Sequence, residues 1–458
     1  MQGALNHSGY ICLNGKSHYA YDFVDGTLTL HLYEAVPEID GKQVLLGHSF
    51  DNKQYAFGLQ LPLNIGNNHL FPINYNFKVD WVVKNFEAGS EFSQAIFSFA
   101  ELQYFCPSSS VVEEINGNEV VFKRNQSTIR DFTFTLLGKE CRASFIVGSK
   151  GKYGLSNSYM QAESLLCIEF DKTGDFSYLK MLYNVVDYVF SFICNRRNTD
   201  CTYMELRGQY PSKTLNNSQV VDCAKGIDSQ IHFYNKYREN IEDLKIISNT
   251  FYSVGILKHI DALFSLVAKD VENGGGFDDA TISISSIHPS VMRRMLIDLQ
   301  QSLQITGAFE FYVRKYLPNM TEVKEHHKNV RIAIEELANS NKFNAKTRKL
   351  LKSLLNQIVR EPALEDKITK AYYGYEGWDG LETCFENEWF DVEKIKELAH
   401  EANAWRNELA HSKREYSPNE MTIKAVRLME HLNYAIVLRN VGFGDDEIKI
   451  LLDKMLVR

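Results

Sequence analysis

The sequence predicts a multidomain α+β protein with an N-terminal antiparallel β-sandwich or barrel, a small α/β middle region and a C-terminal all-α helical bundle. Three observations predict this fold class. Apolar residues alternate at period two through the first third of the chain, their spacing becomes helical near Thr173, and it stays helical almost throughout after Ser290. The 458 residues are 44% hydrophobic and 24% charged, which is the balance of an ordinary globular protein.

Residues 1–172 are predicted to form short antiparallel strands. Two of these strands flank Asn116-Gly117-Asn118, where the Asn-Gly pair supplies the positive φ that a tight hairpin needs. Because helical spacing is absent between the runs, a sandwich or a barrel is the expected architecture. The other alternating apolar runs lie at residues 28–32, 55–61, 75–83, 132–136 and 143–147.

Residues 173–275 are predicted to form a small α/β region. A buried helix is expected after Thr173-Gly174-Asp175, because the apolar residues from Leu179 to Phe190 have helical spacing. Residues 202–236 return to a partly strand-like pattern, and residues 241–271 are helical again. The run Asn273-Gly274-Gly275-Gly276 and the polar Ser/Thr/Asp stretch that follows it predict a linker to the next domain at 276–290.

Residues 291–458 are predicted to form a helical bundle. Ser417-Pro418-Asn419-Glu420 predicts one sharp helix start, with Ser417 as the N-cap and Glu420 completing a capping box. That helix is expected to end before Gly442, and Asp445 is expected to cap a last short helix. Helical apolar spacing also marks residues 295–316, 332–338, a segment starting near Lys342, and residues 389–411.

Charge and composition exclude several classes of protein. The net charge of −8 argues against a protein that coats nucleic acid, although the excess of acidic residues lies entirely before Val291. The eight cysteines form no C-x-x-C pair and lie mostly in apolar runs, as is typical of thiols in a reducing compartment. No apolar run approaches the ~20 residues that cross a bilayer, and the N-terminus has no signal-peptide pattern. We therefore expect a cytoplasmic protein without membrane attachment.

The main candidate for chemistry is Arg406-Asn407-Glu408-Leu409-Ala410-His411, near the end of a predicted amphipathic helix. An Arg and a His at this spacing arise by chance about half the time in a chain of this composition, so the context must carry the interpretation. Imidazole titrates near neutrality, and guanidinium offers a planar fork to phosphate oxygens. The alternative is that both side chains cap the carbonyl groups at the end of the helix.

These residues resemble the HEPN superfamily of helical domains, whose ribonuclease members carry Arg, a polar residue, three more residues and then His. Arg406, Asn407 and His411 match that pattern position for position. The segment from Phe309 to Arg314 and the tail from Leu438 to Gly444 are similar to ApeA-type abortive-infection HEPN proteins, which also place a β-rich region before a C-terminal HEPN domain.

The resemblance implies an anti-phage endoribonuclease that uses no metal ion or other cofactor. It implies that Arg406, Asn407 and His411 are catalytic and that two chains form a homodimer, or a higher oligomer, through the HEPN domain. The β-rich half would restrain the enzyme until a phage-encoded trigger appears, and the RNA substrate, tRNA or mRNA, is left open. A weaker prediction assigns RNA-backbone binding to Lys342, Lys346, Arg348, Lys349 and Lys352.

The alternative function is a HEPN module that dimerises or binds nucleotide without cleaving RNA, with the β-rich domain recognising a phage component. The presence of Arg406, Asn407 and His411 together favours the enzyme.

Overall fold

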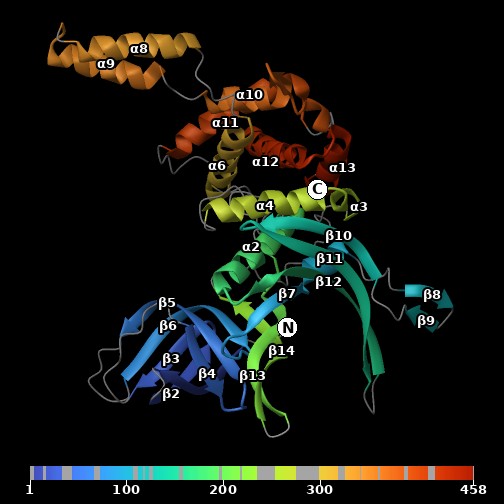
Figure 1. The fold of residues 1–458 in the computed structure, drawn as a ribbon. Coiled ribbons are helices and arrows are strands. Elements are labelled where there is room, and N and C mark those ends of the chain that lie inside the picture. Colours follow the sequence, from blue (N-terminus) through green and yellow to red (C-terminus); the bar gives the residue numbers. More distant parts are fainter. Residues whose placement is uncertain are drawn as a thin grey trace. The chain divides into compact units, whose positions relative to one another are not determined.

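The computed structural model divides the chain into two compact units, and each is considered by itself. Unit 1 comprises Met1–Phe190 and Thr199–Ile241, and unit 2 comprises Ser191–Asn198 and Glu242–Arg458 (Figure 1). The residues that the structure describes are 5–13, 17–32, 44–65, 73–106, 112–116, 119–122, 127–153, 158–194, 199–216, 219–234, 253–274, 299–317, 325–340, 342–358, 362–385, 390–410 and 418–456.

A closed antiparallel barrel forms the first part of unit 1. Its strand order is β6-β3-β2-β1-β4-β5, and β5 pairs back onto β6, so the six strands close a ring. Because the ring is closed, each of the six strands is paired with a neighbour on both sides. The strands are β1 (His7–Leu13), β2 (Ser17–Val24), β3 (Thr27–Leu32), β4 (Val44–Ser49), β5 (Gln54–Ile65) and β6 (Ile73–Lys84).

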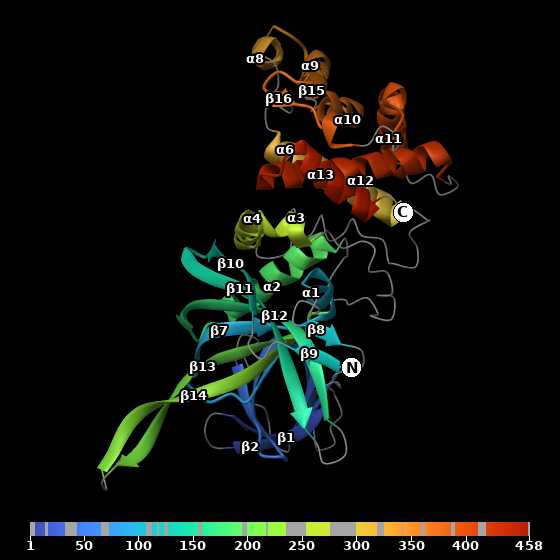
Figure 2. The same cartoon turned by 90° about the vertical axis from the view of Figure 1, so that its right-hand side faces the viewer.

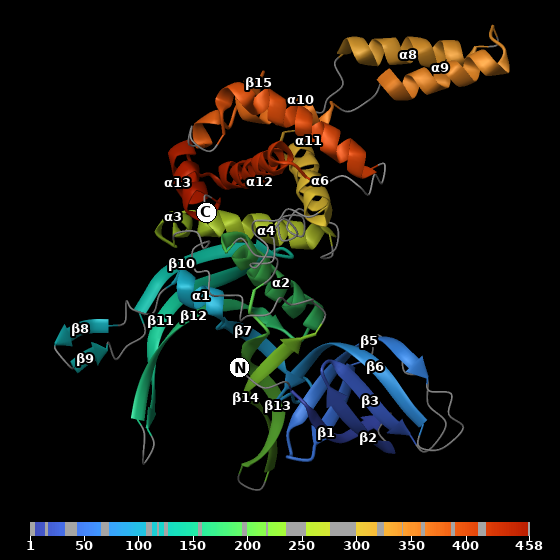
Figure 3. The same ribbon diagram turned by 180° about the vertical axis from the view of Figure 1, so that it is seen from behind.

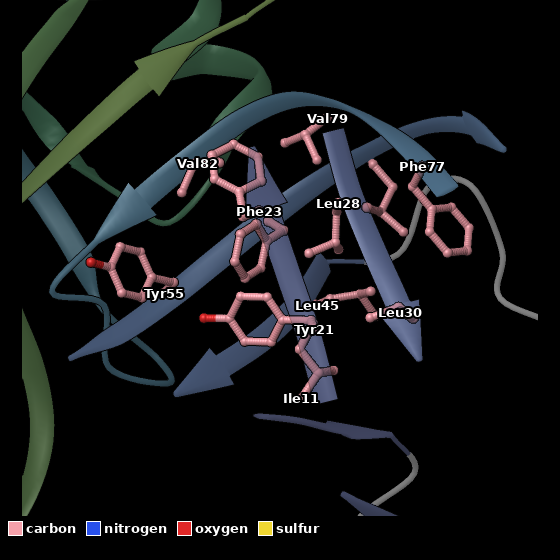
Figure 4. Packing of buried hydrophobic residues seen from close by; sticks show 12 residues of the cluster. Ile11, Tyr21, Phe23, Leu28, Leu30, Leu45, Tyr55, Phe77, Val79 and Val82 are labelled. Atoms are coloured by element: carbon pink, nitrogen blue, oxygen red, sulfur yellow. The ribbon is translucent and has the colours of Figure 1, made fainter. Parts of the chain in front are cut away.

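Inward-facing side chains fill this barrel. Because successive residues of a strand point to opposite faces, the alternating apolar runs of the sequence place one side chain in two inside the ring. Figure 4 shows rings and aliphatic groups from facing strands meeting there, with the hydroxyl groups of Tyr21 and Tyr55 directed the same way. The core residues are Ile11, Tyr21, Phe23, Leu28, Leu30, Leu45, Tyr55, Phe57, Leu59, Phe77, Val79 and Val82.

A second set of strands continues the sheet beyond the barrel in the order β10-β11-β12-β7-β13-β14, with β14 pairing with β6. The hairpin of β13 and β14 extends past its neighbours (Figure 2). A separate small hairpin joins β8 (Val112–Asn116) to β9 (Glu119–Phe122), where the Asn-Gly turn was predicted. The other strands are β7 (Glu91–Phe97), β10 (Ser127–Leu136), β11 (Lys139–Tyr153), β12 (Ser158–Thr173), β13 (Tyr203–Asn216) and β14 (Gln219–Phe233).

Helix α2 (Phe176–Ile193) covers one face of these strands, with the short helix α1 (Ala100–Phe105) beside it. Phe190 packs edge-on against Phe105 and Phe145, and Tyr183 stacks on Phe233 with ring centroids 4.2 Å apart. These contacts bury an aromatic layer between the helix and the sheet, which explains the helical apolar spacing that follows Thr173.

The structure divides residues 173–275 differently from the three-part organisation predicted from the sequence. Strands β13 and β14 are central strands of the sheet of unit 1, between β7 and β6. Helices α3 (Ser253–Leu257) and α4 (Ile260–Gly274) belong to unit 2 instead. The reason is long-range pairing, since strands far apart in sequence become neighbours in a way that local spacing does not reveal. The predicted linker at 276–290 lies outside the described residues.

Unit 2 is helical, as predicted, and the α+β fold class is therefore confirmed. A two-residue strand pair, β15 (Gly374–Tyr375) and β16 (Trp378–Asp379), interrupts the helices. No helix in the part of the chain that the structure describes has the length and apolarity to cross a membrane. The remaining elements, visible in Figure 3, are α6 (Leu299–Tyr316), α8 (Glu325–Asn339), α9 (Ala345–Ile358), α10 (Leu364–Tyr373), η5 (Glu382–Cys384), η6 (Val392–Lys394), α11 (Ile395–Ala410), α12 (Glu420–Val441) and α13 (Asp445–Leu456).

Helix α12 is the buried centre of unit 2, and its N-terminus corrects the sequence prediction. The N-cap is Asn419, whose side chain accepts a hydrogen bond from the backbone N–H of Thr422, whereas the predicted cap, Ser417, lies outside the described residues. At the other end Gly442 adopts a left-handed conformation with φ 109°, which ends the helix. Helix α13 then begins at Asp445, one residue earlier than a capping role for Asp445 implies.

Candidate active site on helix α11

Helix α11 carries Arg406 and Asn407, two of the three predicted catalytic residues, on its solvent-facing side. Its buried stripe consists of Ile395, Leu398, Ala399, Ala402 and Trp405 at spacings of three and four residues. Trp405 is 1% exposed and anchors the last turns of the helix in the core. The next two residues, Arg406 and Asn407, turn outward and are exposed. The helix therefore presents two polar side chains from a firmly packed base.

The Arg406 guanidinium contacts one carboxylate and one amide. Nη2 lies 3.9 Å from Oε2 of Glu310 on α6, and Nη1 donates a 3.4 Å hydrogen bond to Oδ1 of the adjacent Asn407. The side chain is 44% exposed, so its outer surface faces solvent. Since a guanidinium has five N–H donors, the group retains donors for a phosphate that approaches from outside.

Glu310 connects this surface to the interior of unit 2. Its Oε1 atom lies 3.4 Å from Nζ of Lys367 on α10, a side chain that is 1% exposed. One carboxylate thus bridges a buried ammonium and an exposed guanidinium, and three helices meet at this point. Such an arrangement fixes the position of Glu310, because a buried charge requires a partner with little freedom to move.

His411, the third predicted catalytic residue, lies outside the described residues, because the described part of α11 ends at Ala410. The structure therefore brings together Arg406 and Asn407 and adds Glu310 and Lys367 beside them.

Further polar contacts fix α11 relative to its neighbours. Oε1 of Glu401 accepts a 2.6 Å hydrogen bond from the Thr422 hydroxyl in the first turn of α12. Nδ1 of His400 lies 3.0 Å from Oε2 of Glu365 on α10. Three residues of the helix, His400, Glu401 and Arg406, thus have a polar contact with another helix, and the site is held on a rigid scaffold.

The predicted RNA-backbone residues belong to another part of unit 2. Lys346, Arg348, Lys349 and Lys352 lie on α9, and Lys342 lies in the turn before it. The four lysines are exposed and Arg348 is half-buried. They form a basic surface on a different helix from Arg406. Among the residues that the structure describes, no three His, Cys, Asp or Glu side chains gather as metal ligands do.

Sequence reasoning missed Glu310 and Lys367 as members of this site. A signal for Lys367 was present, because Leu364, Lys367, Ile368 and Ala371 form one stripe at helical spacing in which only the lysine is charged. A lysine within an apolar stripe predicts a buried ion pair. Nothing in the local sequence identifies its partner, since Glu310 lies 57 residues away.

Residues 303–447 match the family model of Apea-like HEPN domains. The match begins in α6 and ends in α13, so it includes Glu310, Lys367, Arg406, Asn407 and His411. No curated protein and no solved structure matches the chain. The helices of unit 2 that hold Arg406 are thus those that the family model covers, and the chain is similar to Apea-like HEPN domains over residues 303–447.

Proposed function

We propose that the protein is an anti-phage endoribonuclease that acts in the cytoplasm and cleaves RNA without a metal ion when infection triggers it. The observation that supports this most directly is the outward-facing Arg406–Asn407 pair on a helix of an Apea-like HEPN domain, five residues before His411. The guanidinium is held from the protein side by Glu310 and open on the other. Such a group is suited to a phosphate that gains negative charge during reaction.

The proposed reaction is transesterification within the RNA strand. A base removes the proton of a 2′-hydroxyl, the oxygen attacks the adjacent phosphorus, and the bond to the 5′-oxygen breaks as that oxygen takes a proton. The products are a 2′,3′-cyclic phosphate and a 5′-hydroxyl. His411 is the proposed acid or base, Arg406 stabilises the charged phosphorus centre, and Asn407 orients the guanidinium or binds the substrate.

Two copies of α11 are proposed to form the complete site. Arg406 and His411 are five residues apart, which separates them by about 140° around one helix, so a single helix positions them poorly for one phosphate. A two-fold homodimer would place the Arg of one copy beside the His of the other. The RNA target is proposed to be tRNA or messenger RNA, and the trigger a phage-encoded component.

The test is to express wild type, Arg406→Ala and His411→Ala in cells with and without phage and to sequence RNA fragments that carry 5′-hydroxyl ends. Lys396→Ala is the matched control, because Lys396 is an exposed cation on the same helix. We expect new ends and growth arrest in wild type and in Lys396→Ala but in neither site variant. Protection against phage without new RNA ends would support the non-catalytic dimerisation or nucleotide-binding module instead.

A further inference from the structure

The hairpin of α8 and α9 exposes an unusual number of large apolar side chains. Leu350 is 64% exposed, Val330 45%, Leu337 43% and Leu354 37%. The two helices lie side by side and antiparallel (Figure 1, Figure 3) and pack chiefly on each other. A lone pair of helices buries only one stripe of each helix, and exposed leucines at helical spacing are typical of an interface.

Four of the exposed apolar side chains share one face of the hairpin. On α8 the side turned toward α9 is marked by Ile334 and Ala338, and Val330 and Leu337 lie about a quarter turn to one side of it. On α9 the inner side is marked by Leu351 and Leu355.

Leu350 and Leu354 lie about a quarter turn from that inner side of α9, in the same rotational sense as Val330 and Leu337 on α8. Because the helices run in opposite directions, the same sense of rotation puts both pairs on the same face. We name this surface, formed by Val330, Leu337, Leu350 and Leu354, the hairpin face.

The two helices differ in charge, because α9 is strongly basic and α8 is nearly neutral. Helix α9 has four basic residues and no acidic one, whereas α8 has three glutamates beside Lys328 and Arg331. Two hairpins can pack face to face about a two-fold axis with α8 on α9 or with each helix on its own copy. The second arrangement brings two strongly basic α9 helices together, so Coulomb repulsion favours α8 on α9.

We propose that the hairpin face binds the hairpin face of a second copy of this chain, forming an antiparallel four-helix bundle in which α8 of each copy packs on α9 of the other. Bare RNA is a poor occupant of the same surface, because phosphates would engage the lysines and leave the leucines in water. The contact lies on α8 and α9 and is therefore separate from the proposed pairing of α11. It gives the protein a second means of self-association.

The first test measures the mass of the full chain in solution by light scattering, after nuclease treatment and in about 0.5 M salt, where RNA bridging is lost. Leu350→Glu places a charge in the hairpin face and is expected to weaken association by more than about a hundredfold, which halves the mass. Ile332→Glu is the matched control, because Ile332 is 55% exposed on the same hairpin but lies about 150° from Val330 and Leu337.

Equal masses for wild type, Leu350→Glu and Ile332→Glu would overturn the proposal, and so would an equal decrease in both variants. Because both side chains are exposed, neither change is expected to alter the melting temperature. If α11 also pairs two copies, the Leu350→Glu protein should have the mass of that smaller assembly. If α11 does not pair two copies, the Leu350→Glu protein should have the mass of a monomer.

A second test determines which helices meet. In the proposed bundle Val330 of one copy lies near Leu354 of the other, so differently tagged chains carrying Val330→Cys and Leu354→Cys should form a mixed disulfide on oxidation. Ile332→Cys paired with Leu354→Cys should not cross-link. Preferential cross-linking of Leu350→Cys chains with each other would place α9 on α9 and contradict the proposed arrangement.

Discussion

Glu310 and Arg406, which are 96 positions apart in the sequence, meet with Oε2 3.9 Å from Nη2. The other oxygen of the same carboxylate lies 3.4 Å from Nζ of Lys367, whose side chain is 1% exposed. Glu310 is therefore anchored on its buried side and contacts a cation on its exposed side. The arrangement limits the directions in which the guanidinium can point, and it does so without occupying the surface that faces solvent.

Replacing Glu310 with Gln should reduce RNA cleavage by about tenfold or more while the KM for a short RNA changes little. The amide keeps the shape of the side chain but loses the charge that positions Arg406, so the loss should fall on kcat. Steady-state kinetics on the purified protein measures this split. Glu365→Gln is the matched control, because it breaks a similar contact between α10 and α11 at His400, away from Arg406.

Replacing Arg406 with Lys should cost about a hundredfold or more in cleavage rate even though the charge is retained. An ammonium is a point charge and cannot contact Glu310, Asn407 and two phosphate oxygens with one planar group. Single-turnover cleavage compares the two proteins directly. Near-normal activity of the lysine variant would show that only charge is needed at this position.

Local sequence predicted the parts of this molecule that local forces determine. The Asn-Gly hairpin, the alternating strands and the helices around Phe311 and Trp405 all follow from spacing and turn chemistry. In the same way, the exposed position of Arg406 follows from its place beside the buried stripe of α11.

What the sequence did not predict depends on pairing between distant segments. The closure of β5 onto β6, the insertion of β13 and β14 between β7 and β6, and the contact of Glu310 with Lys367 join residues that no short window contains. The predicted N-cap of α12 was wrong for a different reason. Ser417 and Asn419 are both good N-caps, and only the structure shows which of them accepts the N–H of Thr422.

Asn419→Ala should lower the free energy of unfolding of unit 2 by about 1 kcal/mol, because Oδ1 accepts a 2.8 Å hydrogen bond from the backbone N–H of Thr422. Asn419→Asp should leave the stability unchanged or raise it slightly, since a carboxylate accepts the same bond and interacts favourably with the helix N-terminus. Urea unfolding followed by circular dichroism compares the three proteins. Equal losses in both variants would contradict the capping role.

Gly58→Ala should destabilise the barrel by about 2 kcal/mol or more. A Cβ atom at Gly58 would lie 2.1 Å from Cε2 of the Trp81 ring on the paired strand β6, and that ring is 7% exposed. Gly226→Ala in β14 is the matched control, because a Cβ there meets nothing within 4 Å, and it should be neutral or slightly stabilising. Trp81 is the only tryptophan before residue 242, so its fluorescence change during urea unfolding identifies the barrel transition.

His431 should make unit 2 less stable as the pH falls below about 6.5. Its side chain is buried beside Phe390, Nδ1 donates a 2.7 Å hydrogen bond to the carbonyl of Arg427, and burial lowers its pKa to about 4. The unfolded chain takes up a proton near the ordinary pKa of 6.5, whereas the folded chain does so only near 4. The free energy of unfolding is therefore highest above pH 6.5 and decreases progressively on acidification, by about 3 kcal/mol at pH 4.

Urea unfolding of wild type and His431→Gln across this pH range tests the sign of the effect, since the glutamine variant keeps a donor for the Arg427 carbonyl but cannot titrate. Equal pH slopes in the two proteins would rule out His431 as their source.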